Sequence, residues 1–324
     1  MSSFYLNQEI SLEIEYTTQK KEKEEKVEKK KKIRVATANL HLFRGPTSKN
    51  RISKWIQFGS IVREDNVLLD EYKRRIRAWL SEDQFDIVGL QEVFQSFRFF
   101  TTGIRKKVFE GTGFETVIPH GIGARAYFFN YIFENVLLSK LPLAEGKTFK
   151  DCNFPLPSTI YWVVRSGFTI MPVIFDGRVI LVGNTHLHAS SAEKREEQTL
   201  YIVKAIKELQ VEYGKDVPIL FMGDFNTVPK GAKACGFLNG DDDNYENDGT
   251  LKFFEELIGL KAYPVGDMQD LYTYPAGVDE LQSDIRCRTL DYILYSKHWE
   301  VLLYEVMKVY LSDHFPVRAE FRLI

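Results

Sequence analysis

Residues 217–229 read VPILFMGDFNTVP, and this stretch indicates the fold more directly than any other part of the chain. The apolar run 217–222 has the length and composition of a buried β-strand. Asp224 and Asn226 follow it at once. A carboxylate or amide is costly to bury unless a hydrogen bond or a metal ion satisfies it. The stretch therefore predicts a buried strand whose end carries functional groups.

Similar short apolar runs recur along the chain and alternate with helical patterns. Further strands are predicted at residues 33–40, 85–91, 134–139, 168–175, 178–185, 289–295 and 317–323. One helix is predicted over residues 69–80, with Leu69, Tyr72, Ile76 and Trp79 on its inner face. Another runs from a capping box at Ser190 and Glu193 to about Tyr213, with Leu200, Val203 and Ile206 facing inward. Two faces of sheet with helices outside predict a layered α/β sandwich.

Polar residues at or near the predicted strands form a set with one chemical character. The set is Asn39, Glu92, His186, Asp224, Asn226, Asp291, Asp313 and His314. Each residue alone has a structural explanation, because Asn and Asp favour turns and a single histidine is often a hydrogen-bonded structural residue. Together, hard oxygen ligands and two histidines suit a Mg²⁺ site that performs phosphoryl chemistry.

Six short segments that contain these residues resemble, in their order and spacing along the chain, the endonuclease/exonuclease/phosphatase superfamily. The fold is shared by pancreatic-type deoxyribonucleases, abasic-site endonucleases, inositol polyphosphate phosphatases, deadenylases and neutral sphingomyelinases. The resemblance extends from about Ile33 to the C-terminus. It implies a four-layer α/β sandwich, in which helices flank two packed mixed β-sheets and the site lies at one end of the sheets.

The resemblance also implies how a metal ion is held. Glu92 would be the principal ligand of Mg²⁺, with Mn²⁺ as an alternative, and Asn39 would support it. Asp313 would lie beside the metal cluster. Glu134 occupies a place where some family nucleases have a carboxylate partner for the first histidine.

The catalytic roles follow from the same resemblance. His314 would be the general base, and Asp291 would orient it. Asp224 would orient the nucleophile or serve a second metal position. Asn226 and His186 would hold the non-bridging phosphate oxygens. A histidine with a pKa near 6.5 suits a base at neutral pH.

The substrate stays open between two classes. The segment NTHLHA, residues 184–189, and the run NVLLSKLPL resemble neutral sphingomyelinases. This favours a phospholipid such as sphingomyelin, cleaved in the manner of a phospholipase C. However, residues 164–167, VRSG, replace a Gly-Lys-Gly-like element of that group, and His188 also fits a surface position at a helix entry.

Aromatic clusters at residues 97–100 and 127–133 suit a lipid interface, stacked nucleobases or ordinary core packing. The alternative function is therefore a DNA or RNA endo- or exonuclease, and a distant third is a non-catalytic binding protein of the same fold. The expected partner is a phosphodiester, either a phospholipid headgroup or a nucleic acid.

Composition sets the remaining expectations. The 324 residues carry a net charge of −2, so no overall basic character indicates nucleic acid or an anionic membrane. The three cysteines are far apart and predict neither disulfides nor a zinc site. No signal peptide or membrane-spanning stretch is expected, which favours a cytoplasmic location and leaves peripheral membrane contact open. A monomer is the expected oligomeric state.

The predicted organisation is a charged N-terminal arm, residues 1–32, and a single phosphoesterase domain, residues 33–324. Residues 231–250 predict an inserted acidic loop, whose spacing does not match an EF-hand calcium site.

Overall fold

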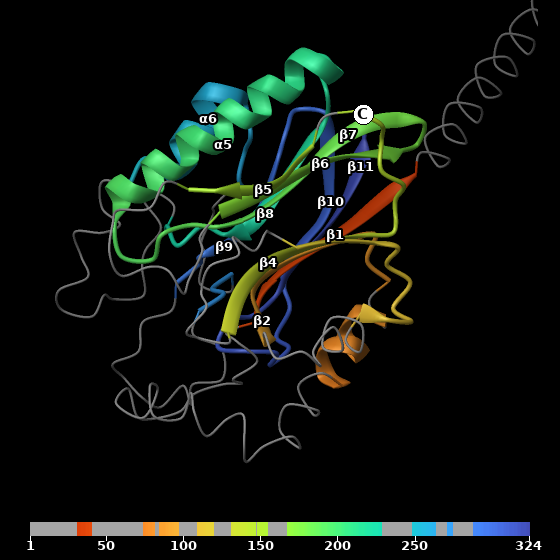
Figure 1. The fold of residues 1–324 in the computed structure, drawn as a ribbon, viewed down its shortest axis with the longest axis vertical. Helices are drawn as coiled ribbons and strands as arrows, with labels where there is room; N and C mark the ends of the chain where they lie inside the picture. The colour runs from red at the N-terminus through yellow and green to blue at the C-terminus, as the bar shows by residue number, and fades with distance from the viewer. Residues whose placement is uncertain are drawn as a thin grey trace, which may run out of the picture.

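The strands of the computed structural model form two sheets packed face to face (Figure 1). Within the described residues, one sheet has six strands in the order β10-β11-β1-β2-β4-β3, and the other has five in the order β5-β6-β7-β8-β9. The described residues are 31–40, 74–81, 84–96, 109–119, 131–146, 148–154, 167–228, 248–263, 271–274 and 288–324.

The first sheet is mixed and is organised around a buried central strand. β1 pairs in parallel with β2 and antiparallel with β11. Its strands are β1 (Lys32–Asn39), β2 (Ile87–Ser96), β3 (Thr116–Pro119), β4 (Tyr131–Ser139), β10 (Trp299–Val306) and β11 (Val317–Leu323).

The second sheet has one parallel pair, β7 and β8, while its other pairs are antiparallel. Its strands are β5 (Phe149–Asn153), β6 (Gly167–Phe175), β7 (Arg178–His186), β8 (Ile219–Asp224) and β9 (Asp291–Tyr295). Helices α5 (Ala192–Tyr213) and α6 (Thr250–Ile258) cover its outer face (Figure 1).

Three apolar layers separate the sheets and helices. Between the sheets, Val35 of β1 packs in one cluster with Met171 and Leu220 of the second sheet. Beneath the helical residues 74–81, a second cluster joins Ile76 to the outer face of the first sheet, and a third joins Ile206 of α5 to the second sheet. Alternate residues of a strand face opposite sides, so central strands buried on both sides need continuous apolar sequence. The predicted sandwich of two mixed sheets flanked by helices is confirmed.

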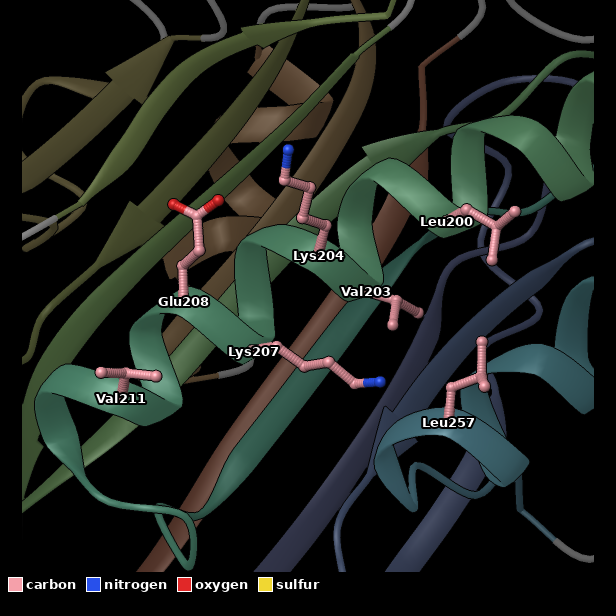
Figure 2. Close-up of a pocket in the computed structure, with 7 residues that line it drawn as sticks. All are labelled: Leu200, Val203, Lys204, Lys207, Glu208, Val211 and Leu257. Atoms are coloured by element: carbon pink, nitrogen blue, oxygen red, sulfur yellow. The ribbon is translucent and has the colours of Figure 1, made fainter.

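Helix α5 departs from its prediction in two details. Its N-cap is Ser191, whose side chain accepts a hydrogen bond from the backbone N–H of Lys194, rather than Ser190. Leu200 is 49% exposed and does not face the core, whereas Val203 and Ile206 are buried as predicted. Figure 2 shows Leu200 directed toward Leu257 of α6, across an open hollow of about 390 Å³. At about 100° per residue, Leu200 and Ile206 lie about 120° apart around the helix, so Leu200 falls outside the buried face that Val203 and Ile206 share.

Other elements were missed or shifted. Strands β3, β5 and β10 and helix α6 were not predicted. β3 and β5 are edge strands of four and five residues, which carry little periodic signal, whereas β10 has eight residues and α6 is clearly amphipathic. β2 continues through Glu92, and β9 begins at Asp291, two residues after the predicted start.

Several predictions fall outside the described residues. They are the arm up to residue 30, Leu69, Tyr72, residues 164–166 and most of the 231–250 loop. Most of the two aromatic clusters also falls outside; residues 131–133 contribute the backbone of β4, but their side chains are not described. The division into an arm and one domain stays a prediction. No helix in the described ranges is both long and apolar enough to cross a membrane.

Candidate active site

Three neighbouring strands of the second sheet bring His186, Asp224 and Asp291 side by side. His186 and Asp224 are in register at the ends of β7 and β8, and Asp224 lies opposite Asp291 at the start of β9. His186 Nε2 is 3.5 Å from Asp224 Oδ2. Both aspartates are almost completely buried. The strand register therefore places two carboxylates and an imidazole at one edge of the sheet.

Asn39 connects this edge to the first sheet. Its Nδ2 donates to Asp224 Oδ2 at 2.9 Å and to Glu92 Oε1 at 3.4 Å. Its backbone carbonyl accepts a hydrogen bond from Ser312 Oγ, which itself accepts one from the backbone N–H of His314. Ser312 therefore fixes the start of the segment 312–314 against the end of β1.

Glu92 reaches the site from a β-bulge. Two residues of β2, Gln91 and Glu92, oppose a single residue of β4, Asn135. Glu92 has a φ of 50°, in the left-handed region that residues with side chains seldom adopt. Bulges redirect side chains, and strained backbone is concentrated at functional sites. Here the bulge brings the Glu92 carboxylate within reach of Asn39.

A buried polar network supports the bulge from the second sheet. Asn184 Nδ2 donates to the carbonyls of Leu90 and Val136, at 3.0 and 3.1 Å. Gln91 Nε2 donates to Asn184 Oδ1 at 2.7 Å and to Thr37 Oγ1 at 3.0 Å. All three polar side chains are fully buried. Such a network, when its groups are paired, fixes one arrangement of the two sheets.

His314 and Asp291 form a hydrogen-bonded pair with Nδ1 and Oδ2 2.8 Å apart. Burial alone lowers the pKa of His314, but the charge and hydrogen bond of Asp291, with the charges of Asp224 and Asp313, raise it to about 10. Thr273 Oγ1 accepts hydrogen bonds from the backbone N–H groups of Leu290 and Asp291, which fixes the start of β9. The imidazole is thus oriented through Nδ1 by a buried carboxylate.

Asp224 is the point on which the other groups converge. Burial, and then the charge of Asp291, raise its pKa to about 6, while His186, His314 and Asn39 act in the opposite direction. A carboxyl group poised near neutral pH beside a second buried carboxylate is typical of a functional site.

Asn226 completes the turn that follows β8. Its backbone N–H donates to Asp224 Oδ1 at 2.9 Å, and its Nδ2 donates to the carbonyl of Leu187 at 3.0 Å. Like Glu92, it is left-handed, with a φ of 49°. A Cβ at the preceding Gly223 would overlap the backbone of Thr185, so the close pairing of β7 and β8 requires glycine there. The GDFN segment therefore holds the ends of β7 and β8 together.

The donor set suits a divalent cation. Ligand atoms of Asp224, Asp291 and His314 lie within 4.8 Å of one another. Asp291 Oδ1 is buried, and no hydrogen-bond donor in the described part of the chain reaches it. Glu92 adds a half-buried carboxylate beside Asn39. Several carboxylates with few cationic partners favour uptake of a hard cation such as Mg²⁺.

His188 does not join this group. Its Nδ1 accepts a hydrogen bond from the backbone N–H of Ser190, and its own N–H donates to Gln198 Oε1. Its carbonyl accepts from Arg195, whose Nε lies 2.7 Å from Asp248 Oδ2 in a fully buried ion pair. Burial, followed by the charges of Lys194 and Arg195, lowers the pKa of His188. The second histidine of NTHLHA is therefore part of a structural turn.

The structure brings Asn39, Glu92, His186, Asp224, Asn226, Asp291, Asp313 and His314 to one end of the sandwich. For Glu134 only the backbone is described, opposite Val93. Sequence reasoning missed Thr273 and the structural role of Ser312. Their hydroxyl groups bond to backbone atoms of segments distant in sequence, and a single Ser or Thr carries no signal for that.

Comparison with known proteins agrees with this geometry. A model of the Endonuclease/Exonuclease/phosphatase family matches residues 36–314. An endonuclease/exonuclease/phosphatase from Beutenbergia cavernae superposes with a TM-score of 0.59 at 19% identity, covering 90% of this chain and 72% of that one. The human Nocturnin catalytic domain with bound sulfate anion gives 0.58 at 19% identity, covering 90% and 95%.

D. rerio TDP2 complexed with single strand DNA product gives a TM-score of 0.56 at 16% identity, covering 90% of this chain and 99% of that one. At these identities the solved structures establish the fold alone. No curated protein matches this chain in sequence.

Proposed function

The chain belongs to the endonuclease/exonuclease/phosphatase family, and we propose that it is a Mg²⁺-dependent phosphodiesterase with His314 as its general base. Family members are metal-dependent phosphoric ester hydrolases, so the reaction class follows from membership. The observation that carries the assignment of the base is the 2.8 Å hydrogen bond between His314 Nδ1 and Asp291 Oδ2, inside a buried carboxylate cluster.

The dyad gives each ring nitrogen a distinct task. Asp291 Oδ2 accepts a hydrogen bond from Nδ1–H of the ring, which leaves Nε2 of a neutral imidazole to take a proton from the attacking water. Negative charge from Asp291, Asp224 and Asp313 raises the pKa of His314. Neutralising the charge of these carboxylates would therefore lower the pKa of His314 and favour the neutral imidazole that a base requires.

The remaining polar groups orient the reactants. Asp224, held by Asn39 and by the backbone of Asn226, is positioned to align the water. His186 and Asn226 would donate to the non-bridging oxygens as charge develops during displacement.

Glu92 and Asn39, with Asp313, would hold Mg²⁺. Asp291 and His314, although their ligand atoms lie close to those of Asp224, act as the dyad in this proposal. When bound, a divalent ion neutralises charge on the phosphoryl oxygens and on the departing oxygen. The left-handed backbone of Glu92 supports this assignment, because a strained residue in a bulge needs a compensating interaction.

Several polar residues of the NTHLHA segment have structural roles, so the segment does not indicate one particular substrate. Asn184 bridges the two sheets, Thr185 Oγ1 donates to the carbonyl of Gly167, and His188 closes a turn. These structural roles account for three of its polar residues without a sphingomyelin headgroup. The resemblance to sphingomyelinases therefore gives little weight to a phospholipid substrate.

Hydrolysis of bis(p-nitrophenyl) phosphate tests the proposal without assuming a natural substrate. Turnover should require added Mg²⁺ or Mn²⁺. His314→Ala should lose on the order of 10²- to 10⁴-fold in kcat, as for removal of a general base. The matched control is His188→Asn, because its amide oxygen can still accept the Ser190 hydrogen bond. Near-normal turnover by folded His314→Ala would refute the assignment.

A further inference from the structure

Helix α5 carries apolar side chains on its outer surface, where a helix that covers a sheet normally presents polar residues. Leu200 is 49% exposed and Val211 is 89% exposed, and neither belongs to the buried face of α5. Leu257 of α6 is 39% exposed. Single exposed apolar residues are common on proteins, but these three line one open hollow between the two helices (Figure 2).

The dimensions of this hollow suit a helix. Val203 also lines it and is only 4% exposed, so the hollow extends down to the buried face of α5. Leu200 and Val211 are eleven positions apart in the sequence, which corresponds to about 16 Å along the axis, or three helical turns. A groove with apolar residues near both ends is the arrangement that receives the apolar face of an amphipathic helix.

The middle of the hollow is basic. Lys204 and Lys207 line it between Leu200 and Val211, and both are exposed. Figure 2 shows Lys207 extended toward α6, whereas Glu208 points to the other side of α5. Two lysines and one glutamate give the lining a net positive charge. Within the described ranges neither lysine forms an ion pair with a carboxylate. The lining is therefore complementary to an occupant with carboxylates in its middle and apolar groups at its ends.

We propose that the hollow between α5 and α6 is a docking site for an acidic amphipathic helix of a partner protein. Apolar side chains of that helix pack on Leu200, Val211 and Leu257, and carboxylates between them pair with Lys204 and Lys207. The hollow lies on the helices that cover the outer face of the second sheet, whereas the catalytic groups lie at the ends of its strands. Docking is therefore separate from the proposed hydrolysis.

A second copy of this chain fits the hollow less well. If two α5 helices packed antiparallel about a two-fold axis, the register that sets Leu200 opposite Val211 would also set Lys204 opposite Lys207, because the two pairs share one midpoint. Parallel packing would set each lysine opposite itself. Like charges in contact oppose association. A membrane also fits less well, because helices that lie on membranes carry their lysines on the polar face and not in the middle of the apolar one.

A fluorescent peptide tests the docking site by anisotropy. The probe is a stapled helix with two leucines eleven positions apart and with glutamates four and seven positions after the first leucine, which matches the spacing from Val211 back to Lys207, Lys204 and Leu200. A second peptide has lysines in place of both glutamates. The acidic peptide should bind with a Kd below about 1 mM, and the basic peptide should not.

Three substitutions connect this binding to the hollow. Lys204→Glu combined with Lys207→Glu should weaken binding of the acidic peptide at least ~10-fold and should confer binding of the basic peptide. Val211→Asp should weaken binding on the order of tenfold, because an apolar contact is lost. The matched control is Lys215→Glu combined with Lys252→Glu, two exposed lysines outside the hollow, which changes the net charge equally and should leave the Kd within about twofold.

Unchanged Tm of each variant would show that lost binding does not arise from unfolding. Equal binding of the two peptides, no binding of the acidic peptide below about 1 mM, or equal losses in the two double variants would overturn the docking site. A dimer in sedimentation velocity that Val211→Asp dissociates would overturn it in favour of a second copy. Binding to vesicles of equal parts phosphatidylcholine and phosphatidylserine that needs Lys204 and Lys207, without binding of the acidic peptide, would overturn it in favour of a membrane. None of these measurements depends on turnover, so failure of the docking site and failure of the proposed function are distinguishable.

Discussion

Replacing Asn184 with Ala should weaken both the fold and the metal site, although Asn184 contacts neither metal nor substrate. Its Nδ2 donates to two backbone carbonyls beside the bulge, those of Leu90 and Val136, and its Oδ1 accepts from Gln91. A buried polar group left without its partner costs about 1–3 kcal/mol. The two carbonyls lose their donor, whereas Gln91 keeps its hydrogen bond to Thr37. The free energy of unfolding should therefore fall by about 3–5 kcal/mol. That is a large share of the ~5–15 kcal/mol typical of domains.

Urea denaturation followed by tryptophan fluorescence measures this loss. The matched control is Asn135→Ala, which removes one side-chain hydrogen bond, from Asn135 Nδ2 to the carbonyl of Gly167. That carbonyl retains the Thr185 hydroxyl as a donor, so a loss of only about 1 kcal/mol is expected.

Mn²⁺ titration by calorimetry tests the functional consequence. Without Asn184 the bulge relaxes and the Glu92 carboxylate loses its position, so the Kd for Mn²⁺ should rise roughly 10- to 100-fold, as for other groups that orient metal ligands. A protein within 1 kcal/mol of wild type that binds Mn²⁺ with unchanged affinity would refute the reasoning.

Four further single substitutions probe the site and its supports. Asp291→Asn should lower kcat by roughly 10²- to 10⁴-fold in the assay with bis(p-nitrophenyl) phosphate, since the ring loses its charged acceptor; a loss below threefold would contradict an orienting role. His186→Asn should lower kcat at least ~10-fold, whereas His188→Asn should stay within about threefold. Burial lowers the pKa of His188 in the folded protein, so the contribution of His188 to stability is present above about pH 6.5 and lost as pH falls through the folded-state pKa. The Tm of His188→Asn should therefore vary less between pH 7 and 5 than the Tm of the wild type does. An unchanged pH profile would argue against the role of His188 in the turn. Arg195→Met should cost about 3–5 kcal/mol in urea because Asp248 stays buried without its partner, and adding Asp248→Leu should recover part of it; equal stability of the single variant and wild type would contradict this.

The predicted strands agree best with the structure where the apolar signal is strongest. The predicted strand at residues 317–323 coincides with β11, and the strand at 168–175 differs from β6 by one residue. Both are buried at alternate or nearly all positions, so local composition was sufficient. Polar residues next to such apolar runs also identified Asp224 and His314, because a buried polar group is costly unless a hydrogen bond or a metal ion satisfies it.

Glu92 shows why the rest required coordinates. The apolar run predicted a strand that ended before it, but the strand continues and bulges, with Glu92 at a φ of 50°. Nothing in the local sequence specifies that conformation. The nearest support comes from Asn184, 92 positions further along the chain and in the other sheet, which bonds to the carbonyl of Leu90 and to the side chain of Gln91.

The sequence by itself determined which segments become buried strands and which polar residues follow them, since the alternation and length of apolar runs are local properties. Only the tertiary structure decided that Asn39 donates to Asp224, 185 positions away, that Thr273 fixes the backbone of Asp291, and that Lys308 lies over Tyr272 beside His314. These contacts join separate sheets and loops. Their geometry depends on strand register and on the packing of the two sheets, which no single segment encodes.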